Sequence, residues 1–196
     1  MRFLPGLICL LPLLSPLAHA ELIDDINDRG ELRIAVEANT PPFNFKDDDK
    51  LTGFEVELGQ LLASELDVRA DFVVTDGSDL LTGVQSGKYD IAINHIAVTA
   101  DLSDRFDFSE PYVQTSTQMI AQKEEPRSIL LVQSLTEEKP KSNPAVSLVI
   151  PFQKGNPAFH ASLENALQRI KDDGRLHALE QKWLRADAGV APKLQN

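Results

Sequence analysis

The sequence predicts an α/β fold in which helices flank a parallel-type sheet. Apolar residues alternate over 32–36, as in a strand, and recur at helical spacing over 54–66. The same order returns with an apolar run at 72–74, a helical segment at 78–86 and a strand-like run at 90–94. A β-α-β-α-β order favours parallel pairing through right-handed crossovers.

Residues 1–20 are predicted to be a cleaved secretory signal peptide. Arg2 provides the positive start, Leu7–Leu14 is an apolar run too short to span a bilayer, and Ala18-His19-Ala20 is a cleavage signal. The alternative is an uncleaved anchor. Because the single cysteine, Cys9, lies inside this run, the mature chain has no thiol for a disulfide or a zinc site. We therefore expect a periplasmic protein.

The acidic composition argues against several kinds of partner. The formal charge is −11, and it becomes −12 once Arg2 is removed with the signal peptide. An acidic surface disfavours nucleic acid and anionic lipid. His160 and His177 lack the matched ligand spacing of a metal site. We also find no nucleophile–base pair, so we expect neither a cofactor nor an enzymatic activity.

Residues that typically begin or end helices and strands predict the remaining elements. Gly and Pro mark most boundaries, and Thr99 is a good helix cap. The expected elements are a helix over 22–28 ended by Gly30, an extended turn at Pro41-Pro42, a solvated turn at 47–50, a short helical turn after Thr99, strands over 112–121 and 146–152, a helix starting at Asn156-Pro157, and a further helix after Gly174.

Several ordered segments carry a family resemblance. They are Gly30–Val36, Pro41–Phe45, Leu51–Leu58, Ser86–Ile91 and Asp107–Tyr112, followed near the C-terminus by Gln153–Asn156, Asp172–Arg175 and Lys182–Trp183. In this order they resemble the family 3 solute-binding proteins, which supply polar amino acids to ABC importers. Ile93-Asn94-His95 and Ser109–Tyr112 are most similar to the cystine-binding branch of that family.

The resemblance implies a periplasmic-binding-protein-like clamshell with one near-complete lobe and a vestigial second lobe. Lobe 1 would comprise residues 21–112 plus 151–186. Residues 113–150 would hold the hinge strands, at 116–123 and 146–152, and the remnant of lobe 2. Residues 187–196 would form a frayed tail.

The resemblance also implies that most anchors for an amino acid are missing. The arginine that takes the α-carboxylate falls at Leu102, a hydroxyl donor falls at Ala97, and an aromatic wall falls at Gly77. The acidic residue of lobe 2 falls at Gln133. Arg105 is a possible replacement for the arginine, although a solvated surface arginine is the plainer interpretation.

Five residues remain as candidates for ligand binding: Glu37, Phe43, Asn94, His95 and Thr99. Structural roles compete with this interpretation. Phe43 is an ordinary core residue, and Asn94 and Thr99 can satisfy backbone groups in turns.

These observations predict a solute-binding protein of an ABC importer that binds an amino acid or a similar small polar solute, weakly or atypically. Its partners would be that solute and an ABC permease. The alternative is a binding-incompetent relative that acts through protein contacts, as a sensor, a modulator or a homodimer that completes its own cleft.

Overall fold

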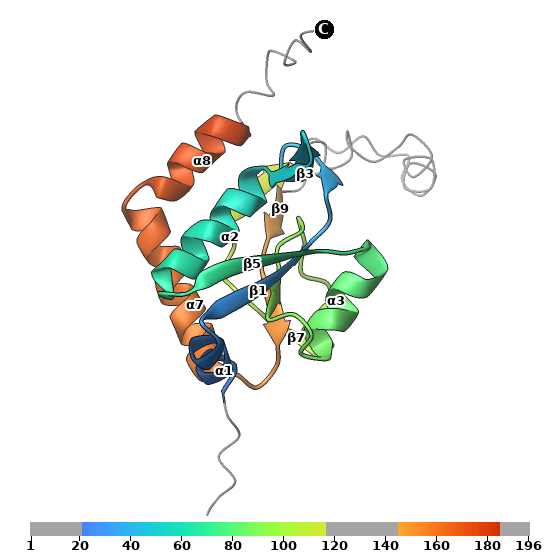
Figure 1. Cartoon of the computed structure of the whole chain (residues 1–196), viewed down its shortest axis with the longest axis vertical. Helices are drawn as coiled ribbons and strands as arrows, with labels where there is room; N and C mark the ends of the chain where they lie inside the picture. The colour runs from blue at the N-terminus through green and yellow to red at the C-terminus, as the bar shows by residue number, and fades with distance from the viewer. Residues whose placement is uncertain (1–20, 117–144, 185–196) are drawn as a thin grey trace, which may run out of the picture.

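The computed structural model describes residues 21–116 and 145–184 (Figure 1). The predicted signal peptide, the lobe 2 remnant with Gln133, and the C-terminal tail lie outside the described residues. The main sheet has the strand order β5-β1-β6-β10-β7. Its strands are β1 (Glu31–Val36), β5 (Arg69–Val74), β6 (Ile91–Ala92), β7 (Phe106–Phe108) and β10 (Pro151–Gln153).

The sheet is mixed rather than wholly parallel. Strand β1 pairs in parallel with β5 and with β6, as the β-α-β-α-β order predicts. Strand β10 instead runs antiparallel to both β6 and β7. The sequence analysis assigned the residues of β10 to a hinge strand and predicted no strand at β7. Both are too short to show periodicity, so only pairing within the sheet defines them: β7 pairs with β10, and β10 pairs with both β6 and β7.

Helices cover both faces of the sheet, and β1 shows why. Its alternate residues Leu32, Ile34 and Val36 belong to the larger core, whereas Ala35 belongs to the smaller one. The larger core is closed by α1 (Leu22–Arg29), α2 (Phe54–Glu65), α7 (Pro157–Asp172) and α8 (Arg175–Trp183). The smaller core lies under α3 (Gly77–Gln85) and α4 (Ala100–Arg105), and Figure 1 shows α3 apart from the other group.

A small hairpin sheet precedes α2. It consists of β2 (Asn39–Thr40), β3 (Asn44–Asp47) and β4 (Lys50–Thr52), where the sequence predicts only turns. Gly53 then has φ 127°, and a Cβ there would lie 2.3 Å from the carbonyl oxygen of Phe43. This close approach lets the carbonyls of Pro42 and Phe43 accept the first amides of α2, both at 2.8 Å.

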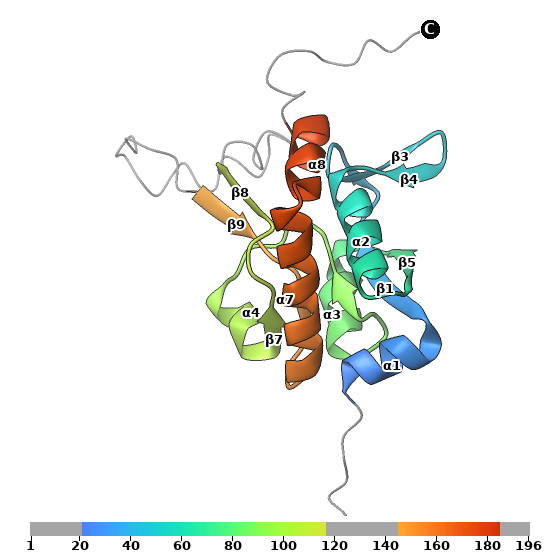
Figure 2. The same cartoon turned by 90° about the vertical axis from the view of Figure 1, so that its left-hand side faces the viewer.

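Two strands leave the body of the lobe. Strands β8 (Val113–Ser116) and β9 (Ala145–Leu148) pair in antiparallel register and run out on the side away from β3 and β4 in Figure 2. We call this pair the ribbon. Strand β9 ends at Leu148, earlier than expected, because Val149 and Ile150 lead into β10. Within the described residues, no helix has the length and apolar character needed to cross a membrane.

A buried carboxylate ties α1 to β1. Asp90 has a fully buried side chain that accepts hydrogen bonds from Arg29 Nη2 at 2.6 Å and from Arg33 Nη2 at 2.7 Å. The backbone amide of Arg33 donates to the same carboxylate at 2.7 Å. These contacts fix the end of the sheet opposite the candidate site.

Candidate functional site

The candidate site is a solvent-open pocket of about 500 Å³ beyond the carboxyl ends of β1 and β5. Open α/β sheets bind ligands at this edge, where loops diverge from adjacent parallel strands. The pocket is lined by Glu37, Ala38, Asn39, Lys46, Val74, Thr75 and Asp76.

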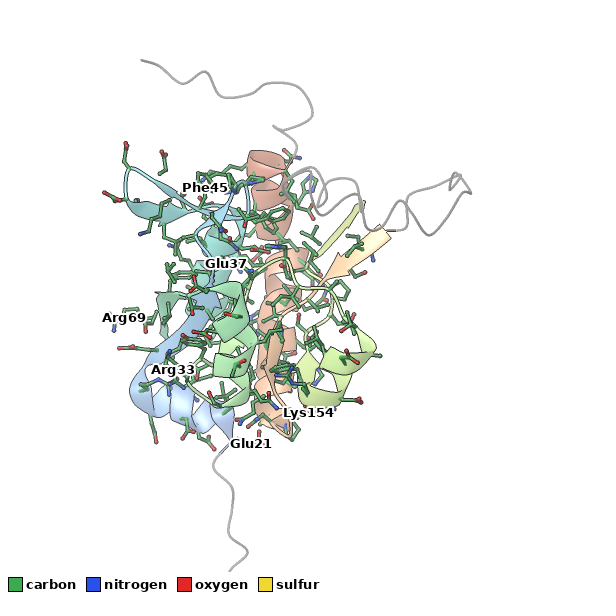
Figure 3. All side chains as sticks on the ribbon, turned by 90° about the vertical axis from the view of Figure 1, so that its right-hand side faces the viewer. Glu21, Arg33, Glu37, Phe45, Arg69 and Lys154 are labelled. Carbon is green, nitrogen blue, oxygen red and sulfur yellow. The ribbon has the colours of Figure 1, made fainter. Side chains whose placement is uncertain are left out.

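The pocket carries both signs of charge. Glu37 follows β1 and Asp76 precedes α3, so two carboxylates reach the pocket from the main sheet. Lys46 brings an ammonium from β3. Figure 3 shows Glu37 between Arg33, nearer the start of β1, and Phe45 on the hairpin. The two carboxylates and the lysine of the pocket provide separate partners for the ammonium and the carboxylate of a zwitterion.

Gly77 determines how much room the Glu37 carboxylate has. A Cβ on Gly77 would lie 3.1 Å from Glu37 Oε1, tighter than most real contacts. The position that the family resemblance assigns to an aromatic wall is therefore occupied here by the carboxylate of Glu37. Gly77 is the first residue of α3, and the backbone amides at this end of the helix favour a negative charge beside it.

A chain of side-chain hydrogen bonds runs inward from Glu37. Asn94 Nδ2 donates to Glu37 Oε2 at 2.7 Å, and the Glu37 amide donates to Asn94 Oδ1 at 3.1 Å. Asn44 Nδ2 donates to the same Asn94 oxygen at 3.0 Å and also to Glu55 Oε2. Tyr112 completes the chain by donating its hydroxyl to Glu55 Oε1 at 2.6 Å. We call these five residues the relay.

Burial controls the ionisation of the relay. Glu55 and Asn44 are completely buried. Loss of solvation raises the pKa of Glu55 from 4.5 to about 7, against the hydrogen bonds from Tyr112, the His95 amide and Asn44, which favour the carboxylate. Burial, followed by the neighbouring Glu55 charge, raises the pKa of Tyr112 well above its usual value. With this pKa, Glu55 changes charge near neutral pH.

The structure brings together four of the five residues predicted from sequence. Glu37 lines the pocket, and Asn94 lies directly behind it. Phe43 is buried in the core, with its ring centroid 6.0 Å from that of His95. Thr99 is separate from them: its hydroxyl accepts the Leu102 amide at 3.3 Å as the cap of α4.

The positions of the missing anchors have structural roles. Leu102 packs against the smaller core, and Ala97 forms a β-bridge with Leu148. Arg105 donates to Gln85 Oε1 from both Nε and Nη2, at 3.1 and 2.5 Å, on the exposed surface. It is therefore the surface arginine of the plainer interpretation and is engaged away from the pocket.

The histidines of the C-terminal helices pair with single carboxylates. His160 lies 3.8 Å from Glu164, and His177 lies 3.7 Å from Glu180. Across residues 21–116 and 145–184, no three His, Cys, Asp or Glu side chains are grouped in a way that could hold a metal ion.

Sequence reasoning did not single out Asn44, Glu55 or Tyr112 as partners of the site. One signal was present for Glu55. It lies three, four and seven residues before Leu58, Gly59 and Leu62, all of which are buried, so helical periodicity places it on the inner face of α2. No local pattern identifies Tyr112, because its contact with Glu55 joins residues 57 positions apart in the chain.

Comparison with known proteins agrees with this architecture. The sequence pattern of the bacterial extracellular solute-binding proteins, family 3, matches residues 32–186. The L-cystine-binding protein TcyJ of Escherichia coli (strain K12) is 36% identical over 107 residues, which are 54% of this chain and 40% of TcyJ. The L-cystine-binding protein TcyA of Bacillus subtilis is 31% identical over 106 residues, 53% of this chain and 39% of TcyA. The matched regions thus span about two fifths of these relatives.

A solved structure resembles the fold as a single domain. The arginine-bound form of domain 1 from TmArgBP, a Phe57Trp mutant, superposes with a TM-score of 0.59 at 22% identity. The match covers 76% of this chain and 98% of that domain. The family match covers most of the chain and agrees with an α/β lobe that is nearly complete. The chain belongs to the bacterial extracellular solute-binding proteins, family 3, and is close to the cystine-binding branch.

Proposed function

We propose that this chain is a periplasmic solute-binding protein of an ABC importer and that it binds a small zwitterionic solute, an amino acid, in the pocket after β1. The observation that carries the proposal is that two carboxylates, Glu37 and Asp76, and one ammonium, Lys46, line the same pocket. The carboxylates suit an ammonium group, and the lysine suits a carboxylate. Family membership and the predicted signal peptide agree with a protein that works outside the cytoplasm.

Binding is expected to be weak. Leu102 occupies the position of the family's arginine, and Lys46 presents a flexible point charge in place of a guanidinium fork. One hydrogen bond to a charged group contributes roughly 1.5–3 kcal/mol, which corresponds to a factor of about 10 to 150 in affinity. The arginine-bound form of domain 1 from TmArgBP supports the idea that one lobe of this fold can hold a ligand.

A thermal-shift screen of residues 21–196 against polar amino acids and L-cystine tests the proposal. A ligand at 100 times its dissociation constant adds about 2.7 kcal/mol of stability. For a chain of this size that raises the Tm by roughly 5–10 °C. Glu37→Gln should abolish the shift, whereas Glu57→Gln, at a partly buried position of α2 where Glu57 pairs with Lys182, should keep it.

The second candidate is a binding-incompetent relative that acts through protein contacts. It is favoured by one observation: Leu102 and Ala97 are committed to packing and to a β-bridge, so neither position offers a donor to a carboxylate. The strands of the ribbon would provide an edge for a second copy. The absence of any thermal shift, together with a dimeric mass by light scattering, would favour this candidate and sink the transport proposal.

A further inference from the structure

We propose that Glu55 is a positioning residue for the pocket: through the two amides of Asn44 and Asn94, its carboxylate sets the orientation of the Glu37 carboxylate and ties it to the start of the ribbon. The proposal deepens the proposed function, because it assigns a regulator to the same pocket. Glu55 itself does not line the pocket.

Glu55 holds three chain segments at once. It accepts from Asn44 on β3, from the His95 amide after β6 at 2.6 Å, and from Tyr112 immediately before β8 at 2.6 Å. His95 has φ 44°, the left-handed region that a residue with a Cβ rarely adopts. The bond from its amide to Glu55 keeps the turn after Asn94 in this conformation.

The order of donors and acceptors along the relay has a direction. With Glu55 ionised, every group it contacts donates to it, and Asn44 Nδ2 also donates to Asn94 Oδ1. Asn94 must then present its Nδ2 to Glu37. The charge on Glu55 therefore fixes both amides in the orientation that holds the Glu37 carboxylate with a donor.

Protonation of Glu55 disfavours that orientation of the Asn44 and Asn94 amides. Oε1 already accepts from the His95 amide and the Tyr112 hydroxyl, so the proton is placed on Oε2. That oxygen faces Asn44 Nδ2, another donor, so the Asn44 amide has to turn. Its Oδ1 is buried and has no hydrogen-bond partner among the described residues, so turning gives that oxygen a donor. Asn94 then has to turn as well, and its oxygen would face the oxygen of Glu37. The pocket carboxylate loses its donor as a result.

The charged groups around the relay do not replace Glu55 in this role. The titratable groups it meets are the Tyr112 hydroxyl and the residue His95, with Glu37 at the far end. Three cations of the helices packed on α2 are engaged elsewhere: Lys182 with Glu57, and Arg169 and Arg175 with Glu65. Burial raises the pKa of Glu55 to about 7, so its charge changes near neutral pH.

The first test needs no ligand. The side-chain amide signal of Asn94 is followed by ¹⁵N–¹H NMR from pH 5.5 to 8.5 in the wild type, in Glu55→Gln and in Glu57→Gln. We expect a titration with a midpoint near 7 in the wild type and in Glu57→Gln, and none in Glu55→Gln. A signal that does not move in the wild type, or that titrates equally in Glu55→Gln because His95 drives it, would overturn the proposal.

The second test uses L-cystine and L-arginine as calorimetric probes at pH 8. The side-chain amide of Gln carries a donor, as the protonated acid does. If a probe binds to the wild type, Glu55→Gln should therefore lower its affinity roughly tenfold, which is within the range common for coupled sites. Glu57→Gln should stay within about twofold of the wild type. Equal losses in both variants would contradict the positioning role. If neither probe binds and the thermal-shift screen of polar amino acids shows no shift, the proposed function fails, and the Asn94 signal alone decides this inference.

Discussion

The contact between Gly83 and Tyr89 gives a sharp test of how α3 supports the pocket. Gly83 lies inside α3, and a Cβ built there would be 2.2 Å from Cε2 of the Tyr89 ring. Real Cβ atoms do not approach so closely, and the ring is only 3% exposed, so it has little room to move. Gly83→Ala should therefore push α3 away from the sheet.

The expected magnitude has two opposing parts. Overpacking a core by one methyl group typically costs about 1–3 kcal/mol. Replacing a helix-interior glycine by alanine returns about 1 kcal/mol. The sum is a destabilisation of roughly 0–2 kcal/mol, and the 2.2 Å contact places Gly83→Ala towards the upper end of that range. In a Tyr89→Ala background the clash is gone, and the same substitution should stabilise the protein by about 0.5–1 kcal/mol.

Urea unfolding of the four proteins in this double-mutant cycle measures the difference. Ser64→Ala, at an exposed position of α2, serves as the control and should have the same effect in both backgrounds. An equal destabilisation by Gly83→Ala with and without the Tyr89 ring would show that the cost does not arise from that contact.

Three further predictions concern stability. Folding raises the pKa of Glu55 from 4.5 to about 7, so the contribution of Glu55 to the free energy of unfolding is fully present below pH 4.5 and is lost as the pH rises through 7. The free energy of unfolding of the wild type, measured relative to that of Glu55→Gln, should therefore fall by about 3 kcal/mol between pH 4 and 8.5. Asp90→Ala should cost roughly 1–3 kcal/mol in urea, because it leaves the Arg33 amide and two partly exposed arginines without their buried acceptor; a loss below about 0.5 kcal/mol would contradict this. Gly53→Ala should destabilise the protein by about 1–3 kcal/mol, because residue 53 has φ 127° and the new Cβ would lie 2.3 Å from the Phe43 carbonyl oxygen. An unchanged Tm would show that the start of α2 can shift.

Long periodic segments were predictable from sequence because their pattern is local. The helix over 54–66 appears as α2, and the parallel pairing of β1 with β5 and β6 follows from the order of the elements. The cap at Thr99 was also predictable, since a hydroxyl that accepts the amide three residues later needs no distant partner. The strand predicted over 90–94 shrank to Ile91–Ala92 because the chain turns at His95.

Part of the candidate site could be predicted in the same way. Glu37 and Asn94 stand at the ends of adjacent parallel strands, so the topology alone places them at one edge of the sheet. Their direct hydrogen bonds, and the pocket that Lys46 and Asp76 share with Glu37, depend on the hairpin and on α3. These elements are set by side-chain packing at long range, which no local pattern records.

Residue types along the chain were enough to establish the order of the elements and the family motifs, because each of these is a local property. The folded structure was needed to show that Leu102 packs into the smaller core, that β10 inserts antiparallel, and that Glu55 meets Tyr112. Glu55 and Tyr112 are 57 residues apart, and their contact forms only when burial of the surrounding apolar side chains brings α2 and the ribbon together.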